Sequence, residues 1–294
     1  MCSHLKLPLD KTSKDNVIAL LVLDVVPGIL TVIGNLLFLT TLIKTTSLHK
    51  PSNVIIAGLC VSDLLVGFVV RPLYASFLYL LLKGKEHETL KFAFNKALFF
   101  CAGLSFCFAT LLSLERYVAV CNPFTYRRKV TFKRQLYTTI FLGFIWLVYA
   151  SLNMYPPISV SALYNIMTIC CLIVCVLVVL LTYFEIYCQI SNQRKQRAAL
   201  GITSINKAVR QRRERSTTFM IGMVLACFLL CYTPLLVMLG YFAQKGNSCW
   251  NDDVNFQFSL WVNFLLLTNS CINPIIYCTK SSDIRRAATN LIFR

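Results

Sequence analysis

The chain has 294 residues, of which 57% are hydrophobic and only 14% are charged. Soluble domains carry about a quarter charged residues, so this composition excludes a water-soluble globular protein and indicates a membrane protein. The formal net charge is +17. The basic residues sit in short segments between apolar runs, which favours membrane topology over nucleic-acid binding. The 14 cysteines form no pair of CxxC motifs, so no zinc site is expected.

Seven apolar runs are long enough to cross a bilayer, which takes about 20 residues in a helix. They are Val17–Ile43, Ser52–Leu82, Phe92–Val120, Leu136–Tyr155, Ala162–Ile190, Thr217–Ala243 and Asn255–Cys278. Residues 1–16 form a polar tail before the bundle of residues 17–279, and the basic segment Ser191–Ser216 is expected to be a loop. Residues 280–294 are too short to span and suit an amphipathic helix on the membrane. The sequence therefore predicts an all-α membrane protein, a seven-helix bundle with a short amphipathic C-terminal helix.

The basic residues are distributed unequally between the two sides of this bundle. Nineteen Lys and Arg residues fall in the connections and tail on one side, and eight fall on the other side. Those eight are nearly balanced by acidic residues, whereas the nineteen are not. Because cytoplasmic segments carry the excess of Lys and Arg, the N-terminus is expected outside the cell and the C-terminus in the cytosol.

Five polar residues from four spans fall near one depth, close to the middle of the membrane. A rise of about 1.5 Å per residue gives each depth from the nearest span end. The five residues are Asn35, Asp63, Ser105, Asn269 and Asn273. One interpretation is a shared polar cavity around the Asp63 carboxylate, which needs a proton, water or a small cation as its partner. The alternative is that each residue separately bonds a neighbouring helix.

Six motifs in order resemble those of the rhodopsin-like G-protein-coupled receptors, and the resemblance covers essentially the whole chain. They are "GNLLFLTTL" around Asn35, "LCVSDLLVG" around Asp63, "SLERYVAVCNPF" around Arg116, the lone Trp146 of the fourth span, "FLLCYTP" around Tyr232 and "NSCINPIIY" around Asn273. The resemblance implies a plasma-membrane receptor that couples an extracellular ligand to a heterotrimeric G-protein through outward movement of the sixth helix. No nucleophile–base pair, nucleotide-binding loop or catalytic metal motif appears in the sequence, so an enzyme is not expected.

The resemblance assigns the residues at the cytosolic ends of the spans to G-protein coupling. Arg116 is expected to be held at rest by Glu115 and by Glu214 at the foot of the sixth span, and to be released on activation. The other residues implied in coupling are Tyr117, Pro123, Phe124, Tyr183 and Tyr277. The alternative for Glu115 and Arg116 is a charged pair that merely anchors the helix at the membrane edge.

The resemblance also assigns a transmission motif and a sodium site in the bundle. The transmission residues are Phe228, Tyr232, Pro234, Asn273 and Pro274. Tyr232 stands where the family usually has a tryptophan, so the alternative for it is an ordinary core aromatic. Sodium, as a negative allosteric ligand, would take oxygens from Asp63, Ser105, Asn269 and Asn273, with Asn35 supporting them. No other cofactor is implied.

The outer half of the bundle departs from the common family pattern. Lys91 replaces the usual cysteine of the third span, Cys175 replaces the usual proline of the fifth span, and the second outer connection is very short. These features resemble the melanocortin, cannabinoid and lysophospholipid receptors. Leu98 stands where amine receptors have an aspartate, and Leu267 where opsins have their retinal lysine, so neither an amine nor retinal is expected.

The remaining candidates for a ligand pocket are Asp24, Arg71 and Tyr74, together with Leu98. Arg71 could receive an anionic group of a ligand. The alternative is an ion pair between Asp24 and Arg71, because buried charges in membranes usually pair. Cys2 and Cys249 are both expected outside the cell and could form a disulfide.

Two other functions stay open from the residues alone. A small ion-coupled transporter could use Asp63 as a relay, although no inverted repeat is evident. A receptor-like protein could also act without a G-protein. Expected partners are the G-protein, an extracellular ligand of unknown class and membrane lipids, but no nucleic acid, and a homo- or heterodimer is open.

Overall fold

The computed structural model describes residues 9–85, 87–154, 158–200, 205–245 and 253–293, and every regular element among them is helical. The predicted spans lie in α1 (Lys11–Lys44), α2 and α3 (Pro51–Leu65 and Arg71–Leu82), α4 (Glu88–Cys121), α6 (Phe132–Leu152), α7 (Ile158–Leu200), α8 (Ile205–Lys245) and α9 (Asp253–Lys280). Seven stretches of these helices are long and apolar enough to cross a membrane. The predicted all-α fold is therefore confirmed.

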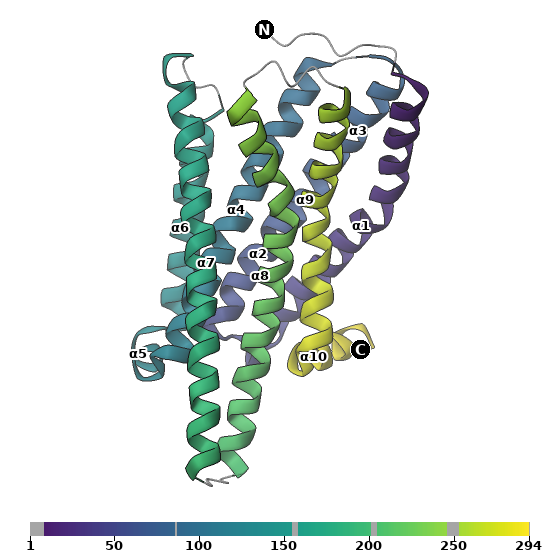
Figure 1. Ribbon diagram of the computed structural model, residues 1–294. Coiled ribbons are helices and arrows are strands. Elements are labelled where there is room, and N and C mark those ends of the chain that lie inside the picture. Colours follow the sequence, from purple (N-terminus) through teal and green to yellow (C-terminus); the bar gives the residue numbers. More distant parts are fainter. Residues whose placement is uncertain (1–8, 86, 155–157, 201–204, 246–252, 294) are drawn as a thin grey trace.

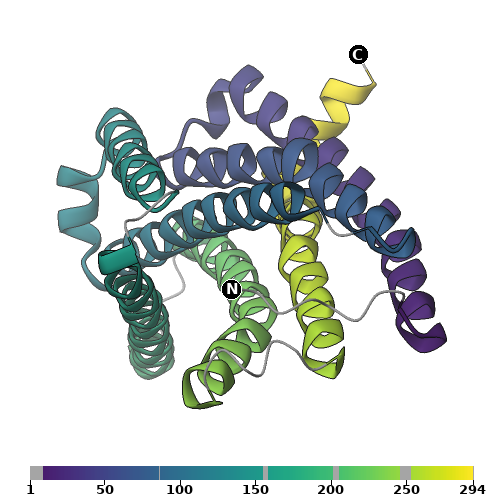
Figure 2. The same cartoon turned by 90° about the horizontal axis from the view of Figure 1, so that it is seen from above.

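The helices form one elongated bundle, with the start of α1 at one end and α10 toward the other end (Figure 1). In Figure 2, α4 crosses the middle of the bundle, and it packs against α2, α6 and α7. The short helices α5 (Pro123–Lys129) and α10 (Ser282–Ile292) lie at the same end, and the segment η1 (Thr46–Leu48) joins α1 to α2. The short amphipathic C-terminal helix was predicted and is present as α10.

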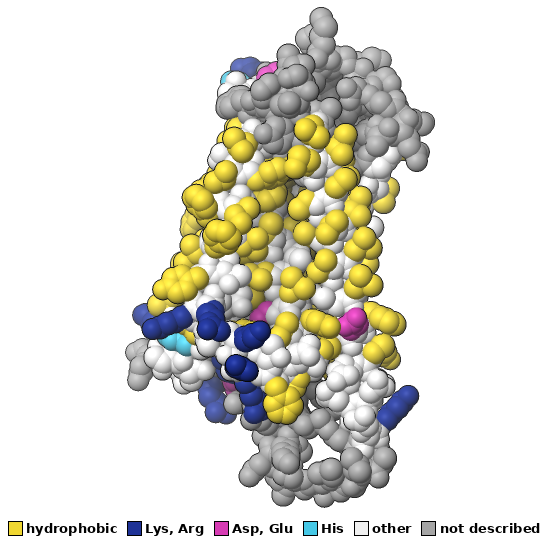
Figure 3. Space-filling view, turned by 90° about the vertical axis from the view of Figure 1, so that its left-hand side faces the viewer, with side chains coloured by type: hydrophobic (Ala, Val, Ile, Leu, Met, Phe, Trp, Pro, Cys, Tyr) yellow, Lys and Arg dark blue, Asp and Glu magenta, His cyan; other side chains and the backbone are white. Residues whose placement is uncertain are grey.

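The surface of the bundle suits a lipid surrounding. On the face shown in Figure 3, hydrophobic side chains cover the middle of the molecule, and Lys and Arg side chains gather toward one end. Large apolar side chains such as Val26, Phe144 and Leu181 are exposed along the helices. Exposed apolar area of this extent is incompatible with water, so the protein is a multi-pass membrane protein.

Two segments differ from the sequence prediction. The first helix begins at Lys11 rather than Val17, because the Asp10 side chain caps it by accepting a hydrogen bond from Ser13 N at 3.0 Å. Much of the segment predicted as a basic loop, Ser191–Ser216, is instead helix, since α7 continues to Leu200 and α8 starts at Ile205. Hydropathy marks where a span leaves the lipid, but helical hydrogen bonds continue in water.

The second span is not one regular helix. Val66–Val70 form a π-helical turn between α2 and α3, immediately before Arg71 and Pro72. Proline removes a backbone donor and its ring crowds the preceding turn, and a π turn is a common way to accommodate such an interruption. The turn also shifts the helical phase of every residue after it, including Arg71.

Close packing between α4 and α6 depends on one glycine. A Cβ atom on Gly103 would lie 1.8 Å from the Trp146 ring. That ring cannot easily retreat, because the Trp146 indole N–H donates to the Phe100 carbonyl at 2.9 Å and the ring also packs against Phe99. Only a glycine therefore fits at this crossing.

Replacing Gly103 by alanine should lower the stability of the protein by about 3 kcal/mol, at the upper end of the cost of overpacking a core. The measurement is thermal unfolding of purified protein in detergent, with surface expression as a second readout. Gly240→Ala is the matched control, because a Cβ there meets no atom within 4 Å. A Gly103→Ala protein as stable as the Gly240→Ala protein would contradict this account of the α4–α6 contact.

Candidate functional site

A buried charge cluster lies at the end of α4. Glu115 and Arg116 are adjacent, and both are buried. Arg116 Nε donates to Glu115 Oε2 at 2.6 Å, and Arg116 Nη2 donates to Oε1 at 2.5 Å. This two-pronged geometry uses both carboxylate oxygens and is the strongest form of a charge-assisted contact. Glu115 and Arg116 therefore bind each other, and do not extend separately toward water as a pair that only anchors the helix would.

Tyr126, on α5, completes this cluster. Its hydroxyl donates to Glu115 Oε1 at 2.5 Å and accepts from Arg116 Nη2 at 3.2 Å. Burial and the neighbouring Glu115 carboxylate raise the pKa of the Tyr126 phenol, so it stays protonated and keeps its role as donor. We call Glu115, Arg116 and Tyr126 the latch. Tyr126 was missed in the sequence, although Pro123 is a helix-starting residue that could have indicated α5.

The other residues predicted around the latch lie as follows. The Glu214 side chain is outside the described residues, although α8 runs through this position. Pro123 begins α5 and is exposed, and Phe124 beside it is 88% exposed. Tyr117 is half-buried. Pro123 and Phe124 thus lie in a short helix that presents an apolar side chain to the surroundings.

Two of the tyrosines predicted to take part in coupling have buried hydroxyls without a hydrogen-bond partner among the described residues. They are Tyr183 on α7 and Tyr277 on α9. Tyr277 is fully buried and packs against Phe38 with ring centroids 4.5 Å apart. Tyr183 packs against Gly222 of α8. A buried hydroxyl without a partner is costly, so this arrangement leaves both groups free to bond in another conformation.

A second cluster surrounds the fully buried Asp63 of α2. Asn273 Nδ2 of α9 donates to Asp63 Oδ2 at 2.9 Å. Asn35 of α1 donates to the carbonyls of Thr31 and Ser270 at 2.9 and 3.0 Å. Ser105 of α4 shares a hydrogen bond of 2.9 Å with Ser62 of α2. These contacts join α1, α2, α4 and α9 by polar bonds, as expected of buried polar residues in a membrane.

Several oxygens of this second cluster have no partner among the described residues. They are the Oδ1 atoms of Asn35, Asp63, Asn269 and Asn273, and all are buried. Buried oxygens without donors suit water molecules or a hard cation. No group of three His, Cys, Asp or Glu side chains is found in the described parts of the chain, so a transition-metal site is not indicated there. One carboxylate with amide and hydroxyl oxygens fits a weakly bound monovalent cation.

The predicted transmission residues form an aromatic stack in the middle of the bundle. Phe228 and Tyr232 of α8 stack with centroids 4.4 Å apart, and Phe106 of α4 meets both rings edge-on. The Tyr232 hydroxyl donates to the Ala102 carbonyl of α4 at 3.2 Å. Pro234 lies inside the same helix, two residues after Tyr232. Tyr232 thus has a polar bond to α4 that an ordinary core aromatic would lack.

Pro274, the last residue of that predicted set, lies inside α9. Its ring packs against Gly34 of α1, where a Cβ would lie only 2.8 Å from Pro274 Cβ. The glycine therefore lets α1 and α9 approach closely at the level of Asn273.

In the outer half of the bundle, the two charged residues predicted for a ligand pocket, Asp24 and Arg71, pair with each other between helices. Arg71 donates to the Asp24 carboxylate, to the Asp24 carbonyl at 3.3 Å and to the Leu267 carbonyl at 2.9 Å. Both side chains are buried. The Tyr74 hydroxyl donates to the Leu260 carbonyl at 2.7 Å, and Leu98 is half-buried. Of the two interpretations of Asp24 and Arg71, the structure forms the interhelical ion pair.

Lys96 connects α4 to the outer end of α6. Its ammonium donates to the carbonyl of Asn153 at 2.6 Å, and Asn153 is the C-terminal cap of α6. A cation at a helix C-terminus also interacts favourably with the helix dipole. This contact ties together two helix ends in a chain where Lys91 replaces the expected cysteine. The predicted pair Cys2 and Cys249 lies outside the described residues.

A bundle of seven membrane helices with a buried acid–arginine pair at one end and a polar cluster at its centre defines a membrane receptor. The chain belongs to the seven transmembrane receptor (rhodopsin) family, whose model matches residues 34–165 and 158–277. The predicted class is thereby confirmed.

Relatives of known function are similar over most of their length. The 5-hydroxytryptamine receptor 1B of Equus caballus is 23% identical over 342 aligned positions, which cover 94% of this chain and 86% of the relative. The receptors of the same name from Mus musculus and Homo sapiens are each 24% identical over 330 positions, covering 89% of this chain and 83% of the relative. The protein is thus a G-protein-coupled cell-surface receptor and not an enzyme or a transporter.

Proposed function

We propose that the latch holds the receptor in a resting state, and that a ligand at the opposite end of the bundle releases it. The single observation that carries this proposal is the burial of Arg116 with its guanidinium bound to Glu115 and Tyr126. On release, the inner end of α8 moves outward and Arg116 becomes available to the G-protein. Phe124, exposed on α5, is placed to insert into the G-protein.

The proposed orientation puts α5 and α10 in the cytosol and the N-terminus outside the cell. It is supported by the Lys and Arg residues that gather at one end of the exposed surface (Figure 3). The basic residues Arg127, Arg128 and Lys129 lie in the last turn of α5. This asymmetry agrees with the rule that cytoplasmic segments are the basic ones.

The test is nucleotide exchange on purified heterotrimeric G-proteins of each subtype, catalysed by the receptor in lipid nanodiscs without ligand. At least one subtype should exchange faster with the wild type than with empty nanodiscs. Arg116→Ala should reduce the rate to that of empty nanodiscs, because the residue that contacts the G-protein is lost. Equal exchange by wild type and Arg116→Ala, in equally folded samples, would contradict the proposal.

We further propose that the ligand is not an amine of the kind named for the relatives. The only buried carboxylate in the outer half of the described bundle, Asp24, is neutralised by Arg71, and Leu98 supplies no charge. A cationic amine in an apolar pocket without a counter-ion is strongly disfavoured. In the same exchange assay, 5-hydroxytryptamine should therefore leave the rate unchanged, and a saturable increase would contradict this.

The ligand is better sought among those of the melanocortin, cannabinoid and lysophospholipid receptors. Supporting features are Lys91, Cys175 and the connection between α6 and α7, which spans only residues 153–157. A connection of that length gives little cover over the outer end of the bundle. A lipid or an extended peptide is consistent with so short a connection.

We also propose a sodium site at Asp63. Asp63 and Asn273 would hold the ion with Ser105 and Asn269, and Asn35 would support them; sodium would supply the positive charge that the carboxylate lacks. The four buried oxygens without partners support this assignment. Because the site joins α2 to α9, an ion there favours the state in which those helices stay together.

Replacing potassium by sodium at constant ionic strength should lower basal nucleotide exchange by about fivefold, the lower end of allosteric coupling. Asp63→Asn should abolish this sodium dependence, because it removes the only charge that holds the ion. Thr279→Val is a control on α9 outside the cluster, since its hydroxyl bonds only its own helix. Full sodium dependence in the Asp63→Asn protein would place the ion elsewhere.

A further inference from the structure

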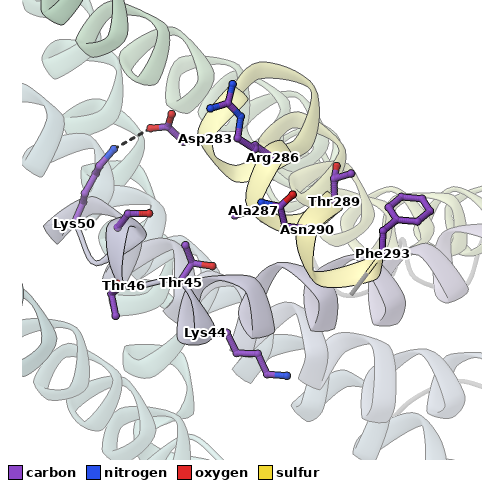
Figure 4. A pocket seen from close by; sticks show the side chains of 11 residues that line it. Lys44, Thr45, Thr46, Lys50, Asp283, Arg286, Ala287, Thr289, Asn290 and Phe293 are labelled. Atoms are coloured by element: carbon purple, nitrogen blue, oxygen red, sulfur yellow. Dashed lines mark hydrogen bonds and ion pairs between the residues drawn. The ribbon is translucent and has the colours of Figure 1, made fainter.

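A cavity of about 760 Å³ lies between the end of α1, the segment η1 and the C-terminal helix α10. Figure 4 shows it from close by, with Lys44 and Lys50 at either end of the α1–α2 connection and Asp283 and Arg286 on α10. None of its lining residues belongs to the latch or to the cluster around Asp63. The cavity is therefore a separate site.

The charges around this cavity are mostly positive. Lys44, Lys50 and Arg286 contribute three cations and Asp283 one anion. Lys50 Nζ forms an ion pair with Asp283 Oδ2 at 3.3 Å, so the one anion is already paired with one of the three cations. Lys44 and Arg286 make no ion pair with any described residue. Two cations are thus left to receive an anionic ligand.

The lining between these cations is polar. Thr45, Thr46 and Asn290 contribute hydroxyl and amide groups, and Figure 4 shows Asn290 on the side of α10 toward the α1–α2 connection. Cations together with neutral hydrogen-bond donors are the groups that bind phosphate oxygens.

The cavity also lies at the boundary of the membrane. Lys44 is the last residue of the first membrane helix, and Ile284 and Ala288 of α10 are buried against the bundle. Phe293, at the rim, is 83% exposed, as suits an aromatic side chain in contact with lipid. On the proposed orientation this is the cytosolic leaflet, which carries the anionic lipids.

We propose that this cavity binds the headgroup of an anionic lipid that carries phosphate groups beyond its diester. The cations lie on two elements, α1–η1 and α10, so one headgroup with several phosphates bridges them and fixes α10 against α1. The acyl chains extend past Phe293 into the bilayer. A free sugar phosphate shares the headgroup chemistry but lacks these chains.

The experiment uses the full-length receptor in phosphatidylcholine nanodiscs that contain a trace of fluorescent phosphatidylinositol 4,5-bisphosphate, with binding read as energy transfer from a dye on the receptor. Arg286→Gln should weaken apparent binding about fivefold, the loss expected for one cation near an anionic surface. Lys44→Gln with Arg286→Gln should weaken it about 25-fold if the two act independently.

Two matched variants separate this site from general charge effects. Arg285→Gln removes the same charge from the same helix, but Arg285 does not line the cavity and bonds the Thr279 carbonyl at 3.4 Å, so binding should stay within about twofold. Asp283→Asn should tighten binding, because it removes the anion and frees Lys50. A folding defect would not produce an increase.

Three outcomes would overturn the proposal. Equal weakening by Arg285→Gln and Arg286→Gln would show only a general attraction to the charged surface. Equal competition by phosphatidylserine at matched total charge would show that the extra phosphates are not recognised. Soluble inositol 1,4,5-trisphosphate that competes as well as the lipid would show that the ligand is a free phosphate compound.

Discussion

Glu115→Gln and Tyr126→Phe should each raise ligand-independent nucleotide exchange about tenfold or more. Glu115 accepts two charge-assisted bonds from Arg116 and one from the Tyr126 hydroxyl. Each hydrogen bond to a charged group contributes about 1.5–3 kcal/mol. On the proposed mechanism the latch exists only in the resting state, so both variants weaken that state alone. The population of the active state rises by the corresponding factor.

One control for this prediction changes a tyrosine outside the latch, and the other removes Arg116 itself. Tyr137→Phe on α6 removes an exposed hydroxyl and should leave exchange unchanged. Glu115→Gln combined with Arg116→Ala should be inactive, because release matters only if Arg116 is there to engage the G-protein. Basal exchange that stayed at the wild-type rate in Glu115→Gln and Tyr126→Phe, at equal receptor amounts, would show that the cluster is only a structural anchor.

A variant of Glu214 extends this test. The family resemblance places it at the foot of α8, and its side chain lies outside the described residues. Glu214→Ala should also raise basal exchange if it contacts Arg116 at rest. An effect of Tyr126→Phe without an effect of Glu214→Ala would mean that α5, rather than α8, holds Arg116.

The spans and the depth of the polar residues could be predicted because both follow from hydropathy and helical rise. Asp63 and Asn273 were placed at similar depth, and their side chains meet. Tyr126 could not be found in this way. The position of the Tyr126 side chain depends on the angle between α5 and α4. The turn that sets this angle leaves no periodic pattern in the sequence.

The partner of Arg71 was left open by the sequence for a different physical reason. A π turn precedes it, and one extra residue rotates everything after it by about 100° relative to a regular helix. The helix face on which Arg71 lies therefore cannot be predicted by counting residues from Asp63 at about 3.6 residues per turn. Similarly, hydropathy ended the helix of the fifth span too early and began the helix of the sixth span too late, because it reports lipid contact and not helix.

Arg71→Leu alone should destabilise the receptor by about 3–5 kcal/mol, because it leaves the buried Asp24 carboxylate without its partner. Asp24→Leu together with Arg71→Leu should restore most of this stability, since replacing a buried ion pair by packed apolar side chains is often neutral or stabilising. The measurement is thermal unfolding of the purified variants in detergent, with surface expression in cells. Lys50→Ala, which breaks a pair whose side chains are 48% and 27% exposed, should cost less than about 1 kcal/mol.

The double variant also separates the two interpretations of Arg71. If Arg71 serves the bundle only, the double variant should fold and catalyse nucleotide exchange like the wild type, with the same response once an activating ligand is known. If Arg71 receives an anionic ligand, the double variant should fold and keep its basal rate but lose that response. A double variant as unstable as Arg71→Leu would contradict the ion pair, and the bond from Arg71 to the Leu267 carbonyl would then be the contact that holds α3 to α9.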